Sequence, residues 1–248
     1  MMNPDGQPIV YGTPLEMLQI SEAPRHLSLD GGFHQLCLLR PPVKRSTVQT
    51  FIDLSELSQG IEYMASRTEE FSDLTALGNC RNLVQHQLLE LPADPDDVSR
   101  VLDVHNEGAT AEETDTVFQI YLTCRLAALL YSLHVTFPLP RKVPQRDRLL
   151  PALQSCMSSI NERYTDLRIA EILLWCAVIG GATAYGSKQR LWFLSEIGCL
   201  CDLLDMHTWD QMLEFLESFA WVRSACDQAG EVIWREVSIL YGGKNKKL

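Results

Sequence analysis

The chain has 248 residues, of which 46% are apolar and 21% are charged, and its formal net charge is −11 at pH 7. This length and apolar content exclude a wholly disordered chain and predict one large or two small domains with a substantial core. The negative charge repels phosphate backbones, so we do not expect this chain to bind nucleic acid directly.

Residues 1–65 form a proline-punctuated lead that we expect to be less ordered than the rest. Prolines recur along it, and the pair Gly31-Gly32 indicates a turn. Two short elements, at 33–39 and 48–57, are only weakly indicated. No basic segment followed by an apolar core opens the chain, so its N-terminus does not have the pattern of a signal peptide.

Residues 66–241 are predicted to form one all-α domain, a bundle or array of about seven main helices. Apolar residues at helical spacing favour a first helix at about 66–91, and no strand-like alternation of any length appears. The other helices are expected at about 111–137, 146–162, 166–185, 188–204, 209–219 and 230–241.

The most apolar long stretch, residues 117–137, is expected to lie in the core rather than in a membrane. Gln119, Arg125 and His134 fall within the stretch. A charged side chain near the middle of a membrane span is unfavourable in lipid, so a buried core helix is the better interpretation.

Residues 169–193 combine an apolar helical run, a glycine pair and a second amphipathic run. Asp166 precedes the first run and is expected to cap it. Gly180 and Gly181 follow a helix rather than a strand, which disfavours a phosphate loop and predicts close helix packing. Arg190 is expected to bind carbonyl groups at the end of the preceding helix.

No catalytic residue, cofactor site or metal site is indicated. No two cysteines have two residues between them, and no two of the six histidines are four residues apart, so zinc-binding patterns are missing. No serine or cysteine has an evident base partner. Most of the eight cysteines lie in apolar runs, which fits a reducing compartment such as the nucleus or cytosol.

Basic residues gather at two places, within residues 141–148 and in a basic tail at 242–248. Both clusters are expected to be solvated, and a weak nuclear-import signal is the alternative. The first cluster consists of Arg141, Lys142, Arg146 and Arg148.

Five tryptophans recur through the C-terminal half of the chain. Core packing is one interpretation. The other is a groove for a small effector or a partner helix, because aromatic walls with few polar groups suit both. The candidate groove consists of Trp175, Arg190, Trp192, Trp221 and Trp234.

Four segments resemble, in order and rough spacing, the regulatory domain that follows the zinc-cluster DNA-binding domain in fungal transcription factors. The resemblance covers roughly residues 66–241, and the paired cysteines of the zinc cluster itself are missing from the sequence. The segments are residues 80–92 (CRNLVQHQLLELP), 124–140 (CRLAALLYSLHVTFPLP), 173–193 (LLWCAVIGGATAYGSKQRLWF) and 219–237 (FAWVRSACDQAGEVIWREV).

The resemblance implies a transcription regulator-like protein without enzyme activity. It would work in the nucleus, or alternatively the cytoplasm, and control a metabolic gene set through protein partners or a small-molecule effector. Two other classes remain open. One is a helical ligand-binding protein or enzyme of a biosynthetic pathway, for which Glu171, Arg190 and Arg125 are the candidate residues. The other is a structural interaction protein.

Overall fold

The structure, a computed structural model, describes residues 12–20, 32–66, 74–104, 108–138, 144–160 and 166–241. These ranges are all-α, which confirms the predicted fold class, and their one extended pairing is an isolated bridge between Val43 and Leu102. The predicted basic tail lies outside the described residues. The helices are α1 (Pro14–Met17), η1 (Gly32–Leu38), α2 (Arg45–Ser66), α3 (Leu74–Glu90), η2 (Pro95–Asp97), α4 (Val98–Val101), α5 (Ala111–Tyr131), η3 (Ser132–Thr136), α6 (Pro144–Ser159), α7 (Leu167–Thr183), α8 (Arg190–Leu203), α9 (Trp209–Glu217) and α10 (Arg223–Tyr241).

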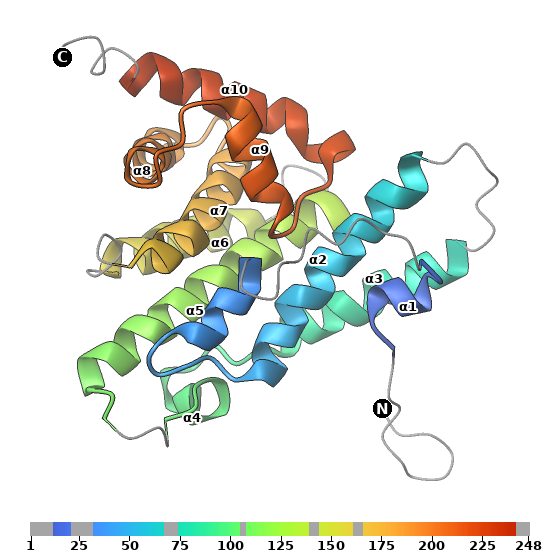
Figure 1. The fold of residues 1–248 in the computed structure, drawn as a ribbon, viewed down its shortest axis with the longest axis horizontal. Coiled ribbons are helices and arrows are strands. Elements are labelled where there is room, and N and C mark those ends of the chain that lie inside the picture. The colour runs from blue at the N-terminus through green and yellow to red at the C-terminus, as the bar shows by residue number, and fades with distance from the viewer. Residues whose placement is uncertain are drawn as a thin grey trace.

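Helix α7 is the centre of the domain. It packs against η1, α5, α6, α8 and α10, and 13 of its 17 residues are buried. A helix that is apolar around most of its circumference needs such cover on every side. Figure 1 shows α8 and α10 at one end of the molecule and α1 and α3 at the other, with α5, α6 and α7 crossing the middle.

The starts of α5 and α7 follow from their capping residues. The Thr110 hydroxyl accepts a hydrogen bond from the Glu113 backbone N–H at 3.1 Å, and the Glu113 carboxylate accepts one from the Thr110 N–H at 2.6 Å. Asp166 accepts a hydrogen bond from the Arg168 backbone N–H at 2.9 Å, which confirms the predicted cap.

The segment Ala111–Thr136, formed by α5 and η3, is long and apolar enough to cross a membrane. However, 67% of its most apolar window is buried inside the domain. Ile120, Cys124 and Ala127 are completely covered by neighbouring helices. The segment therefore lies where the sequence predicts it, in the core.

The two weakly indicated elements of the lead are both present: η1 occupies Gly32–Leu38, where 33–39 was expected, and the 22 residues of α2 occupy Arg45–Ser66, where 48–57 was expected. The buried residues of α2 are a mixture of apolar and polar types. The sequence therefore shows no continuous apolar stripe from which the whole helix could be predicted. The polar ones are used in the core: the Ser58 hydroxyl accepts a hydrogen bond from Tyr131 at 2.9 Å, and Ser55 donates to the Phe219 carbonyl. The second of the two elements is therefore longer than expected.

The last helix begins earlier than predicted. Helix α10 starts at Arg223 rather than at Gly230, which lies in its interior. A Cβ atom at Gly230 would stand 2.5 Å from the Trp209 ring, so the glycine provides room for a close contact. Gly230 has the sequence pattern of a helix boundary, but in the structure it is a packing residue inside the helix.

The eight cysteines are free thiols, five of them buried and three half-buried. Burial raises the pKa of the Cys201 and Cys226 thiols to about 12, so neither supplies the reactive thiolate at pH 8. We expect iodoacetamide at pH 8 to alkylate half-buried Cys199 in the native protein and to reach Cys201 and Cys226 only after denaturation. Peptide mass spectrometry measures this, and equal native rates at Cys199 and Cys201 would contradict it.

Candidate functional site

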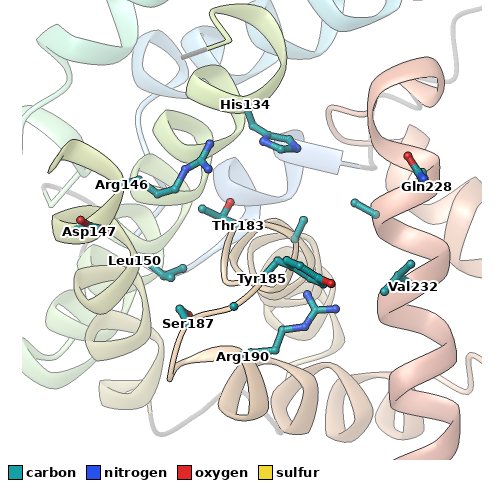
Figure 2. Close-up of a pocket in the computed structure, with 13 residues that line it drawn as sticks. His134, Arg146, Asp147, Leu150, Thr183, Tyr185, Ser187, Arg190, Gln228 and Val232 are labelled. Atoms are coloured by element: carbon teal, nitrogen blue, oxygen red, sulfur yellow. The ribbon is translucent and has the colours of Figure 1, made fainter. Parts of the chain in front are cut away.

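A cleft of about 650 Å³ opens where α6, the end of α7, the start of α8 and α10 meet. Figure 2 shows side chains from these helices, together with His134 of η3, arranged around it. The connection between α7 and α8 closes one side, and Gly186 turns the chain there with a φ of +77°. The volume falls within the range of small-molecule sites.

Arg146 places a cation on the wall that α6 contributes. The residue is only 8% exposed, whereas Asp147 and Arg148 beside it are exposed. Leu150 lies one turn further along α6 and lines the same wall. Figure 2 shows the guanidinium group of Arg146 pointing toward His134. A guanidinium so far removed from water gains strongly from a nearby anion.

His134 reaches the cleft from a π-helical turn, Ser132–Thr136. The Phe137 backbone N–H donates to the Ser132 carbonyl at 2.7 Å, and the hydroxyls of Ser132 and Thr136 are 2.9 Å apart. Turns of this kind are rare and frequently occur at functional sites, because they re-aim one side chain. Here the turn ends α5 with an imidazole directed at the cleft.

Arg190 forms the opposite wall, at the start of α8. Its Nε and Nη2 atoms lie 3.0 and 2.8 Å from a Glu236 carboxylate oxygen on α10. Its Nη1 atom donates to the Gly181 carbonyl in the last turn of α7, which confirms the predicted bond to a helix end. The guanidinium also lies 5.8 Å from the centre of the Tyr185 ring. Arg190 therefore ties three helices together.

The rest of the lining is mainly small or apolar, including Ala182, Ala229 and Val232. Below Ala182 and Ala229 a narrow apolar space continues toward Tyr131 and Trp221. Eight of the thirteen lining residues are polar or charged, so the cleft combines largely polar walls with an adjoining narrow apolar space.

Comparison with known families places this cleft within a recognised domain. A family described as "Fungal specific transcription factor domain" matches residues 41–242, which include every helix around the cleft. The chain belongs to this family. No curated protein and no solved structure matches the chain. The transcription factor domain has a transcription regulator-like role, and the match includes α2 as part of the domain.

The five residues of the candidate groove do not line one groove in the transcription factor domain. Arg190 lines the cleft, and Trp221, 5% exposed, borders the narrow space below it. Trp175 is completely buried in the core. Trp192 and Trp234 are half-buried and contribute to neither space. Trp175 is therefore a core residue. The cleft is formed mainly by residues outside the candidate groove, which we call its principal residues.

Two of those principal residues, Arg146 and His134, are not predicted from the sequence. As part of the basic cluster at 141–148, Arg146 is expected to be solvated, and the structure shows this to be wrong. A signal exists, because Leu150 and Leu153 follow at four and seven residues and put Arg146 on the apolar face of α6. His134 has no such signal.

The other residues considered for an enzyme lie outside the cleft. Glu171 accepts a hydrogen bond from the Gln35 side chain, and the Arg125 Nε donates to the Leu91 carbonyl at 3.0 Å. Each of these two hydrogen bonds joins a helix to a neighbouring segment. Within the described residues, no group of three or more His, Cys, Asp or Glu side chains is placed to hold a metal ion.

Replacing Arg190 by methionine is expected to lower the free energy of unfolding by about 1–2 kcal/mol, because Glu236 and the Gly181 carbonyl lose their donor. The loss is small because the Glu236 side chain is 36% exposed and water screens the ion pair. Urea denaturation of Arg190→Met, Glu236→Gln and the double variant measures the coupling energy between the two side chains. We expect this coupling energy to be about 1 kcal/mol. Arg235→Met, at an exposed neighbour on α10, is the control. Additive effects would contradict the bridging role.

Proposed function

We propose that this transcription factor domain controls a metabolic gene set from the nucleus by responding to a small effector and passing the signal to a protein partner. Family membership supports the regulatory role. The net charge of −11 supports a role without direct DNA contact, because a DNA-binding face is usually basic. The observation that carries the effector part is the cleft of about 650 Å³.

The position of the cleft suits a regulatory response. A molecule held there contacts α6, the α7–α8 turn and α10 at once, and α7, α8 and α10 pack against one another. A ligand stabilises the arrangement of helices to which it binds best. Occupancy of the cleft therefore biases the position of α8 and α10, and a transcription factor or co-regulator that contacts these helices would detect the change.

Gene deletion tests the proposal. We expect loss of the gene to change a co-regulated set of metabolic transcripts, measured by RNA sequencing across several carbon and nitrogen sources. Wild-type protein should restore the set. The Val232→Trp variant fills the cleft from α10 and should fail to restore it. The control variant Ser238→Trp changes an exposed residue of the same helix and should restore it. An unchanged transcriptome in all conditions would overturn the proposal, and a fluorescent fusion tests the nuclear location.

A ligand-binding protein of a biosynthetic pathway is the second candidate, and the same cleft favours it. The two functions differ in what deletion changes first. A pathway protein alters metabolite levels while transcripts stay constant, whereas a regulator alters transcripts before metabolites. Metabolite and transcript profiles taken together after rapid depletion of the protein separate the two.

A further inference from the structure

We propose that a face formed by α2 and α3 binds an amphipathic helix of a protein partner, and that residues 12–20 of this chain occupy the face in cis. Glu56 and Gly60 of α2 and Cys80 of α3 define this surface, which we call the α2–α3 face. None of the three lines the cleft, so the face is separate from the proposed effector site. Binding at the face does not depend on transcription and is tested separately.

Residues 12–20 lie on the α2–α3 face as a short helical turn. Helix α1 packs against both α2 and α3 (Figure 1). The Leu15 backbone N–H donates to the Glu56 carboxylate at 3.5 Å, and the Cys80 thiol donates to the Pro14 carbonyl at 3.8 Å. Free N–H groups at the start of a helix favour a nearby carboxylate, so the face selects the N-terminal end of a helix at Glu56.

Gly60 leaves a notch in the face for one leucine side chain of the occupant. A Cβ atom at Gly60 would stand 2.5 Å from the Leu18 Cδ1 atom and 3.6 Å from the Ile20 Cδ1 atom. The three nearest heavy atoms all belong to these two side chains, so a larger residue at position 60 would meet the occupant first. An apolar side chain that enters such a notch is the usual anchor of a helix that binds a protein surface.

Residues 12–20 are held like a bound peptide rather than like a core element. Only Pro14 among them is buried. The next described element, η1, instead places Phe33 and Leu36 in the core with 2% and 0% exposed. The family match begins at residue 41, so it includes the α2–α3 face and excludes its occupant. A segment with so few buried contacts separates from its domain at a low cost in free energy, and a partner can then reach the face.

The α2–α3 face and its occupant define the chemistry of the partner. The partner helix needs an apolar side chain at the place of Leu18 and a free N-terminal end at Glu56. The Glu56 carboxylate and the net charge of −11 both disfavour an acidic partner. Glu16 and Gln19 of the occupant are exposed, so the face does not contact the opposite side of the helix. A neutral or basic amphipathic helix therefore fits the face best.

Opening the face in the full chain tests whether it accepts a helix in trans. A dye-labelled peptide of residues 11–22 is titrated with the full chain and followed by fluorescence anisotropy. In the wild type the tethered segment competes at a high local concentration, so binding should be weak. Leu18→Asp puts a charge in the apolar notch, releases the segment and should tighten peptide binding roughly tenfold or more. Binding to Leu18→Asp that is no tighter than to the wild type would overturn the proposal.

Gln19→Asn is the matched control for Leu18→Asp. Residue 19 is exposed, and asparagine readily adopts its φ of 55°. The segment should stay in place, so this variant should bind the peptide as weakly as the wild type does. Tightening equal to that of Leu18→Asp would show that the leucine does not hold the segment and would contradict the proposal. Circular dichroism checks each variant, and Leu18→Ala replaces Leu18→Asp if the latter does not fold.

Two glycine variants locate the bound peptide in the Leu18→Asp chain. Gly60→Ala places a methyl group against the leucine of the peptide and should weaken binding by roughly tenfold or more. Gly78→Ala adds the same group to α3 in open space and should leave binding unchanged. Unweakened binding with Gly60→Ala would place the peptide elsewhere and refute the assignment.

A second copy of the chain is the alternative occupant, and light scattering separates the two cases. We expect the wild-type chain to stay monomeric over the concentrations at which Leu18→Asp binds the peptide. A wild-type dimer that Gly60→Ala dissociates would show that the segment of another copy occupies the face, and would overturn the assignment to a different protein. Peptides with Gln19→Lys and Gln19→Glu test the charge of the partner, and tighter binding of the glutamate peptide would contradict a neutral or basic helix.

Discussion

Replacing Trp175 by alanine is expected to lower the free energy of unfolding by about 4 kcal/mol, a large part of the total stability of a typical domain. Trp175 is completely buried at the centre of α7. Its ring meets Phe33 edge-on at 4.9 Å and stacks against Phe219 at 6.1 Å. Its indole N–H donates to the Ala220 carbonyl at 3.0 Å. The side chain thus joins α7 to η1 and to the segment before α10.

Urea denaturation followed by far-ultraviolet circular dichroism measures this effect. Trp175→Phe keeps most of the ring volume and removes the hydrogen bond, so it should destabilise by a smaller amount, on the order of 2 kcal/mol. Trp192→Ala is the matched control, because Trp192 is half-buried and should lower stability by only about 1 kcal/mol. Equal losses at Trp175 and Trp192 would show that Trp175 is not the centre of the core.

The helices with continuous apolar patterns were predictable from the sequence. Residues 172–181 (ILLWCAVIGG) carry no polar side chain, so composition alone indicates a central helix, and all ten are buried in α7. Its start was also predictable, because Asp166 combines a short acceptor side chain with a position just before the apolar run. Local chemistry determines such features, and local chemistry is what a single sequence displays.

Helix α2 could not be predicted with the same certainty, because its stability depends on partners remote in sequence. Ser58 hydrogen-bonds to Tyr131, and Ser55 bonds to the Phe219 carbonyl, 164 residues away. Isolated from those partners, buried serines and threonines indicate a solvated segment. Only the tertiary structure shows that these polar groups are satisfied inside the core.

Most residues of the cleft were equally difficult to predict from the sequence. Its lining comes from separate segments between His134 and Val232, and no short motif contains them. Arg190 was predictable because its partner carbonyl lies only nine residues away. The tryptophan pattern identified aromatic mass but not exposure. The candidate groove therefore included Trp175, which lies in the core, and omitted Arg146, which lines the cleft. Arg146 is a different case, because its position on the apolar face of α6 has a local signal in Leu150 and Leu153.

Replacing Gly180 by alanine is expected to destabilise the domain by about 2 kcal/mol, although alanine normally stabilises a helix relative to glycine by about 1 kcal/mol. A Cβ atom at Gly180 would stand 2.3 Å from the ring of Phe193 on α8, and that ring is completely buried. A buried ring cannot swing aside, so α7 and α8 must separate.

The neighbouring glycine provides the control. A Cβ atom at Gly181 would meet the terminal methyl groups of Ile197 and Ile233 at 3.2 and 3.5 Å, which can shift by small rotations. Gly181→Ala should therefore stay within about 1 kcal/mol of the wild type, while Gly181→Leu, with three more carbon atoms, should lose on the order of 2 kcal/mol or more. Thermal and urea unfolding of the three variants measures this order. If Gly180→Ala proves as stable as Gly181→Ala, the contact between α7 and Phe193 is looser than the structure indicates. Since Arg190 binds the Gly181 carbonyl at the same junction, the cleft wall would then be loose as well.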